Sequence, residues 1–168
     1  EHVIGPGGKG SNQSVAVAKA GGKVNFISKI GNDPYGEMAL KMYKESNVDI
    51  SNVIISKDYK TGAAGILVNK QTGENAITVV PGAAGKITKE DIDQASDTIK
   101  QSSIFLTQLE APIEVVEYAI EIASSHNITT ILNPGPAAKL QDKTFKLIDY
   151  FTPNETEASF YVNHKVET

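Results

Sequence analysis

An alternation of strand-like and helix-like segments over residues 88–161 constrains the fold of this chain more than any other feature. Helix start signals, a Thr88/Asp91 capping pair and Pro112 among them, separate short runs typical of buried strands. A strand that reaches the next one through a helix returns parallel to it, with a right-handed crossover. The pattern therefore predicts an α/β fold with a parallel sheet. We expect strands at 103–108, 129–132 and 150–152, and helices at 88–100, 113–125, 139–148 and 153–161.

The first half of the chain has two parts. Small residues, with Asn12 as the cap and Gly21-Gly22 as the stop, predict a helix over 11–20. A strand over 23–30 and a helix over 35–46, opened by Asp33-Pro34, follow. Residues 53–82 then predict a small antiparallel sheet set apart from the main layer, with strands at 53–56, 62–68 and 75–80 and a tight turn at 69–73.

Composition excludes several classes of function. The 168 residues are 40% hydrophobic with a net charge of −4, which is typical of one globular domain and disfavours nucleic acid as a partner. The chain has no cysteine, so disulfides and thiolate metal sites are excluded. No apolar run reaches the length of a membrane span, so we expect no membrane association and a cytoplasmic location. Functional residues within ten positions of Glu1 lead us to expect an excerpt of a longer protein.

The glycine-rich segment Gly5–Asn12 is the first candidate for chemistry. Glycines let a ligand approach the backbone, and the N-terminus of the following helix offers free N–H groups. A phosphate-binding P-loop is excluded because Gly10, not Ser or Thr, follows Lys9. Lys9 and Asn12 can donate to hydroxyl groups, which indicates a polar ligand. A glycine-rich entry loop with a surface lysine explains the same residues equally well.

Three further candidates follow predicted strands, where ligands bind in open α/β sheets. Glu110 can accept hydrogen bonds from two adjacent hydroxyls, although a glutamate at a helix start is the simpler explanation. Asn154 and Glu157 share a helix face and suit Mg²⁺, directly or through water, but Asn154 is equally an ordinary N-cap. For 133–136 we favour a rigid turn. His2, His126 and His164 lack metal-ligand spacing.

Together these segments resemble the ribokinase branch of the PfkB-type carbohydrate kinases. The resemblance rests on Gly7–Ser14 with Gly21 and Gly31 at the family's spacing, and on the run Thr152–Glu157. Weaker matches lie between them in family order: Gly31-Asn32-Asp33 with Gly36, Thr61-Gly62, Gly73–Asn75, Pro81–Ala84, Gln108–Glu110 and Leu132–Pro134.

The resemblance implies a Rossmann-like three-layer fold, here partial, with helices on both faces of the sheet. It also implies transfer of the ATP γ-phosphoryl group to a sugar hydroxyl, in this branch the 5-hydroxyl of ribose. ATP, Mg²⁺ and a monovalent cation such as K⁺ would take part, and the hairpin within 53–82 would be a lid that pairs two subunits. Sugar binding would fall to Gly8, Lys9, Asn12 and Glu110, the ATP phosphates to Asn154, and water-mediated Mg²⁺ binding to Glu157.

Departures from the family pattern limit these expectations. The family's first strand and its G-A-G-D segment, which supplies the catalytic base and the anion hole, have no counterpart in residues 1–168. We therefore expect this chain alone to be inactive, with no catalytic base and no monovalent-cation site of its own. Exposed sheet edges and apolar surface should follow. A non-catalytic sugar-binding module, and a related kinase for another pentose, a nucleoside or a fructose derivative, are the alternatives.

Overall fold

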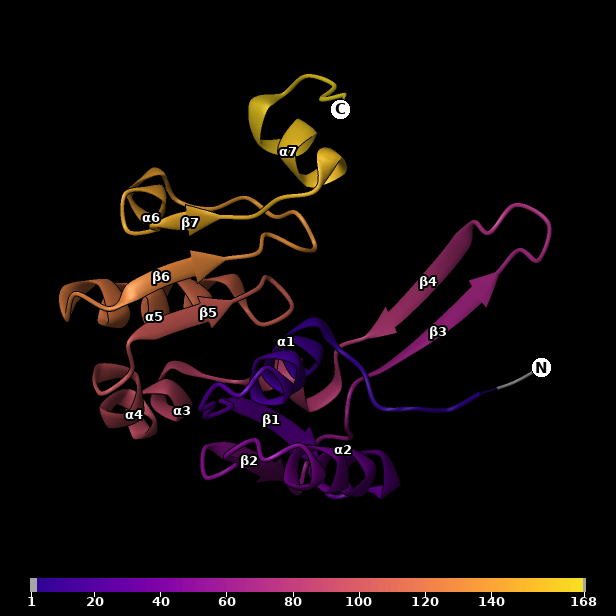
Figure 1. Ribbon diagram of the computed structural model, residues 1–168, viewed down its shortest axis with the longest axis horizontal. Coiled ribbons are helices and arrows are strands. Elements are labelled where there is room, and N and C mark those ends of the chain that lie inside the picture. Colours follow the sequence, from indigo (N-terminus) through magenta and orange to yellow (C-terminus); the bar gives the residue numbers. More distant parts are fainter. Residues whose placement is uncertain (1–2, 168) are drawn as a thin grey trace.

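The computed structural model describes residues 3–167, which form an α/β body and a projecting β-hairpin (Figure 1). The helices are α1 (Lys9–Lys19), α2 (Pro34–Glu45), the 3₁₀ turn η1 (Gly82–Lys86), α3 (Lys89–Gln94), α4 (Ser96–Lys100), α5 (Ile113–Ser125), α6 (Asp142–Phe145) and α7 (Glu155–Val162). The strands are β1 (Ser28–Gly31), β2 (Val53–Ser56), β3 (Ala63–Val68), β4 (Asn75–Val80), β5 (Ile104–Thr107), β6 (Thr129–Leu132) and β7 (Tyr150–Phe151).

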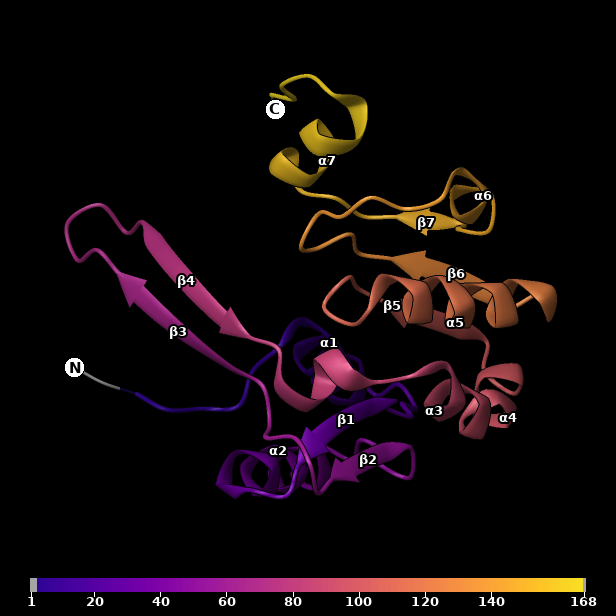
Figure 2. The ribbon, with the colours of Figure 1, turned by 180° about the vertical axis from the view of Figure 1, so that it is seen from behind.

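The predicted parallel sheet is confirmed in the second half of the chain. Its strand order is β5-β6-β7, all parallel, and α5 connects β5 to β6 across one face (Figures 1 and 2). Helix α5 packs against this sheet through small and branched side chains on its inner face. Val115, Val116, Ala119, Ile120 and Ala123 are all buried there.

Strands β1 and β2 form a second parallel sheet, backed by a cluster around Ala39, Tyr43 and Val48. This pairing corrects one expectation, because 53–56 was assigned to the antiparallel sheet with the hairpin. The assignment was wrong since periodicity identifies a strand but not its partner. Within residues 3–167, β3 and β4 are the antiparallel pair, in a register that places Ile66 opposite Ile77.

Several element boundaries differ from the predicted ones. Helix α1 begins at Lys9, with Gly8 and not Asn12 at the N-cap. The predicted strand over 23–30 shortens to β1, the helix over 88–100 breaks at Ala95, and the helix over 139–148 reduces to α6. Among residues 3–167, no helix combines the length and the apolar character that a membrane crossing requires.

Apolar surface is exposed on the edge strand β5 and along the hairpin β3–β4. Ile104 on the edge strand β5 is 56% exposed, and every residue of β3 and β4 is exposed. The expected apolar surface is therefore present on the described part of the chain. The hairpin projects from the body beyond η1 (Figure 2).

Candidate functional site

The carboxyl ends of β5, β6 and β7 lie at one edge of the sheet (Figure 1), and Glu110, Asn154 and Glu157 come after these strands in the sequence. Hydrogen bonds join the loops that follow these strands. The Leu109 N–H donates to the Gly135 carbonyl at 3.2 Å, and the Asn133 side-chain amide donates to the Thr152 carbonyl at 2.8 Å. Because parallel strands end at the same edge, residues 19 and 26 positions apart in the sequence become neighbours here.

Lys9 and Glu110 meet at the start of α1. The Lys9 backbone N–H donates to Glu110 Oε2 at 2.9 Å, and Lys9 Nζ lies 3.3 Å from Glu110 Oε1. The carboxylate thus caps α1 from another part of the chain, which explains why the helix begins before Asn12. Both side chains remain about 40% exposed, at 43% and 37%, so a ligand can reach them.

Gly8 has a positive φ of 97°, a conformation that residues with a side chain rarely adopt. A β-carbon on Gly8 would also lie 4.0 Å from Glu110 Oε2. Glycine therefore allows the backbone to turn into α1 beside the carboxylate.

Gly135 lies where the sugar-binding and the metal-binding candidates converge. A β-carbon at this position would lie 2.7 Å from Lys9 Cε, 2.6 Å from Glu157 Oε1 and 3.3 Å from Asn133 Oδ1. A larger residue would force the ends of the Lys9 and Glu157 side chains to move and would crowd Asn133. At 133–136 the sequence favoured a rigid turn over a part in shaping the ligand cleft, although the segment follows a strand. The structure places Gly135 and Asn133 beside the candidate residues.

Asn154 and Glu157 form a reciprocal capping box at the start of α7. The Glu157 N–H donates to Asn154 Oδ1 at 2.8 Å, and the Asn154 N–H donates to Glu157 Oε2 at 2.9 Å. The N-cap interpretation of Asn154 is therefore confirmed. A role for Asn154 at the ATP phosphates stays a prediction.

Glu157 is only 8% exposed, and within residues 3–167 its second oxygen, Oε1, accepts no hydrogen bond and lies above Gly135 near Asn133 Oδ1. Two hard oxygen atoms in a small cradle fit a water-mediated Mg²⁺ ion. In the same described range, no group of three or more carboxylate or imidazole side chains could hold a metal ion by itself.

Asn12 lies on the exposed first turn of α1, and its backbone N–H bonds to the Gly8 carbonyl. The structure does not connect its side chain to Lys9 or Glu110, so its sugar-binding role stays a prediction. Gln108, at the end of β5, instead donates to Gln13 on α1 and packs against Gly10. Sequence reasoning missed this amide pair, which fixes α1 over the end of the sheet.

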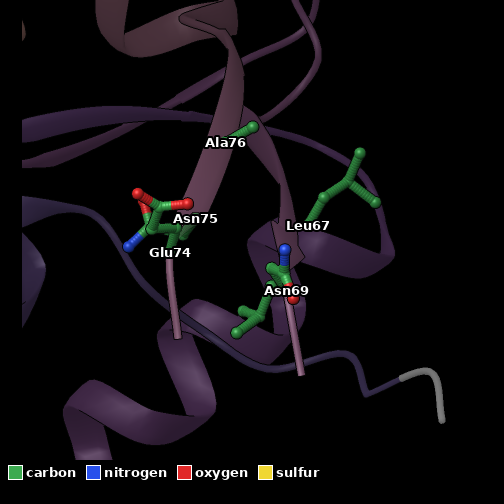
Figure 3. Close-up of a pocket in the computed structure, with 6 residues that line it drawn as sticks. Leu67, Asn69, Glu74, Asn75 and Ala76 are labelled. Carbon is green, nitrogen blue, oxygen red and sulfur yellow. The ribbon is translucent and has the colours of Figure 1, made fainter. Parts of the chain in front are cut away.

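One surface hollow lies away from these residues. It measures about 510 Å³ and is formed by the hairpin alone (Figure 3). Its lining contains none of the predicted site residues and is Leu67, Val68, Asn69, Glu74, Asn75 and Ala76. Polar groups that converge from separate loops identify a binding site better than the size of an open hollow, so we assign the candidate site to the strand ends.

Comparison with known proteins gives a family match along the whole chain. Residues 1–168 match the model of the family described as pfkB family carbohydrate kinase. Ribokinase of Staphylococcus aureus is 42% identical over 160 residues, which cover 95% of this chain and 52% of that protein. The chain belongs to the pfkB family of carbohydrate kinases. It spans about half the length of the curated relatives it matches.

Two other proteins similar to this pfkB-family chain are a curated enzyme and a solved structure. Deoxyribokinase of Salmonella typhi is 35% identical, covering 98% of this chain and 54% of that protein. The structure of Arabidopsis thaliana ribokinase complexed with ribose and ATP matches with a TM-score of 0.88 and 25% identity, over 96% of this chain and 53% of that one. The predicted α/β ribokinase fold is therefore confirmed.

Proposed function

We propose that this chain is part of an ATP-dependent sugar kinase that phosphorylates the 5-hydroxyl of ribose. The chain of contacts from Glu110 to Lys9, and from Lys9 across Gly135 to Glu157, carries the proposal. Their closeness supports a site in which one small molecule contacts all three side chains. Ribokinase is the name of several relatives, and one solved relative is complexed with ribose and ATP.

In this proposal the sugar lies between the start of α1 and the end of β5. Glu110 accepts hydrogen bonds from two sugar hydroxyls, while Lys9 and Asn12 donate to sugar oxygens. Gly8 lets the backbone approach the ring. Lys9 already contacts Glu110, so the two charges are positioned before the sugar arrives, and little reorganisation is needed.

The phosphate side of the reaction lies at the start of α7. The helix N-terminus and Asn154 face the ATP phosphates, and Glu157 holds Mg²⁺ through water. The ion neutralises phosphate charge when it is bound. The catalytic base, the anion hole and a monovalent-cation site belong to sequence outside residues 1–168, so the 168-residue chain alone is expected to be inactive.

The hairpin β3–β4 serves as a lid over the sugar, and water exclusion there prevents wasteful hydrolysis of ATP. Its exposed apolar side chains are covered by the same hairpin of a second copy, giving a homodimer. The enzyme is expected to work in the cytoplasm, where ATP is available.

The test is an ATP-dependent phosphorylation assay of the full-length gene product on ribose, deoxyribose, fructose and adenosine. Ribose should give the highest kcat/KM. Deoxyribose as the best substrate would instead place the protein with the deoxyribokinase relative. Sugar binding measured by calorimetry, without phosphorylation of any sugar, would support a non-catalytic binding module.

A pair of variants localises the sugar site. Glu110→Gln should raise the KM for the sugar about tenfold or more, because a hydrogen bond to a charged group typically contributes that factor. Glu114→Gln, an exposed glutamate on the first turn of α5, serves as the matched control and should leave KM unchanged. Equal KM values for the two variants would exclude Glu110 from the sugar site.

A further inference from the structure

The two ends of the hairpin are held together by backbone contact at its root. The Ala83 N–H donates to the Lys60 carbonyl at 2.7 Å. Gly82 has a positive φ of 56°, and a β-carbon there would lie 2.5 Å from the Gly62 nitrogen. The chain that enters β3 and the chain that leaves β4 therefore move as one unit.

Asp33 joins this root to the body. As the N-cap of α2 it accepts the Gly36 N–H at 2.9 Å through Oδ1, and through Oδ2 it accepts the Thr61 N–H at 2.7 Å. The Thr61 hydroxyl in turn accepts the Gly31 N–H at 2.9 Å, at the end of β1. The hydrogen bond from the Thr61 N–H holds the pKa of Asp33 below its ordinary value; burial opposes this, and the Gly36 N–H supports it.

The backbone packs closely around Asp33, so that only glycine fits at positions 31 and 36. A β-carbon on Gly31 would lie 2.4 Å from Asp33 Oδ2 and 2.5 Å from the Thr61 nitrogen. One on Gly36 would lie 2.2 Å from the Gly31 carbonyl oxygen. By contrast, β3 and β4 are exposed along their whole length. The orientation of the hairpin is thus decided at its root and not by packing along its strands.

We propose that Asp33 is a positioning residue that, through Thr61, fixes the orientation of the hairpin and thereby the affinity for the sugar. The proposal rests on the proposed function in taking the hairpin as the sugar lid. The fixed root itself is independent of that function. A hairpin held at the correct angle closes over the sugar without first losing conformational freedom.

The test uses the full-length gene product with three substitutions at the hairpin root and one control substitution elsewhere. Asp33→Asn keeps an acceptor for the Gly36 N–H but can turn its amide N–H₂ toward the Thr61 N–H, so it removes the hairpin half of the contact. Thr61→Val removes the hydroxyl, and Thr61→Ser restores it. Thr88→Ala is the control, because it removes a helix N-cap on α3 that makes no contact with the hairpin root.

Amide hydrogen exchange is the first measurement. Asp33→Asn should speed exchange in residues 57–63 and 81–84 about tenfold, the factor expected for a charge-assisted hydrogen bond. Thr61→Val keeps the backbone N–H that bonds to Asp33 and removes only the neutral bond from the Gly31 N–H, so it should speed exchange about threefold. Thr61→Ser and Thr88→Ala should leave it near the wild-type rate. Unchanged exchange in Asp33→Asn overturns the proposal. If that variant fails to fold, equal exchange in Thr61→Val and Thr61→Ser overturns the claim that residue 61 holds the hairpin root.

Steady-state kinetics are the second measurement. The KM for the sugar should rise about three- to tenfold in Asp33→Asn while the KM for ATP stays within about twofold, since only the lid is misplaced. General destabilisation would raise both. Faster exchange with an unchanged sugar KM overturns the link between the root and sugar affinity. A wild-type protein that phosphorylates no sugar overturns the proposed function and leaves the exchange result standing.

Discussion

At the scale of single residues, individual carboxylates hold together segments that are far apart in the sequence. Glu110 caps α1 through the Lys9 N–H. Glu117, 5% exposed on α5, accepts the Gln141 N–H at 2.7 Å, the Gln141 side-chain amide at 2.6 Å and the Thr144 hydroxyl at 2.8 Å. A buried carboxylate is tolerated only with such partners. Glu117 therefore fixes the segment around Gln141 and Thr144 against α5.

The pKa of Glu117 gives a pH-dependent prediction. Burial raises this pKa, but hydrogen bonds from Gln141 and Thr144 outweigh burial, and the net pKa lies below the ordinary value of 4.5. A lowered pKa means that the carboxylate stabilises the fold above pH 4.5 and that this stability is lost as the pH falls through the folded-state pKa. Glu117→Gln should cost about 1–3 kcal/mol at pH 7.

Urea unfolding at pH 7 and at decreasing acid pH measures this effect. The difference between wild type and Glu117→Gln should shrink as the pH falls below 4.5. Glu114→Gln, an exposed glutamate on the same helix, should show little cost at either pH. A difference for Glu117→Gln that is constant across the pH range would contradict the prediction.

At the scale of elements, two helices begin with the same capping box and differ in what lies beyond it. In α3 the Thr88 hydroxyl accepts the Asp91 N–H, and in α7 Asn154 Oδ1 accepts the Glu157 N–H. Helix α3 faces Lys29, which pairs with Asp91 at 2.7 Å, whereas α7 opens onto the candidate site. A comparison of the two capping residues can therefore distinguish an effect on helix stability from an effect on ligand binding.

Asn154→Ala and Thr88→Ala should each lose about 1 kcal/mol of unfolding free energy, the usual contribution of an N-cap. Only Asn154→Ala should raise the KM for ATP, about tenfold, if its amide also faces the phosphates. Thermal unfolding and steady-state kinetics on the full-length protein provide the two values. The same KM for ATP in both variants would assign Asn154 a capping role alone.

At the scale of the whole molecule, the hairpin carries a continuous apolar row on one face, in addition to exposed Leu67 and Val80 on the other. The register places Ile66 opposite Ile77 and Ala64 opposite Val79, so these side chains and Val68 share a face. Ile66, Val68, Ile77 and Val79 are each more than half exposed. An isolated two-stranded hairpin is marginally stable in water, so cover from a second copy would stabilise it.

Ile77→Lys should therefore shift the full-length protein toward monomer, because a charge would be buried between two hairpins. Thr78→Lys, the neighbouring residue on the opposite face, is the control and should leave the mass unchanged. Light scattering after size exclusion at several concentrations measures the effect. An unchanged mass for Ile77→Lys would remove the apolar face from the dimer proposal.

Local patterns in the sequence were sufficient for most elements. The helix α5, the strand β6 and the Thr88 capping box were predicted at their observed positions, because periodicity and capping are local properties. The partner of β2 was not, and the start of α1 was displaced because the Lys9 N–H donates to Glu110, about a hundred residues away. Such contacts leave no signal in a local window.

The sequence by itself determined the α/β class, the hairpin and the family, and it pointed to Lys9, Glu110 and Glu157. These follow from residue types and spacing along the chain. Only the tertiary structure brought Lys9 and Glu157 together at Gly135, joined Glu110 to Lys9, and connected Asp33 to Thr61 at the hairpin root. The physical reason is that a site is a set of distances between separate loops, and parallel strands set those distances only when the sheet has formed.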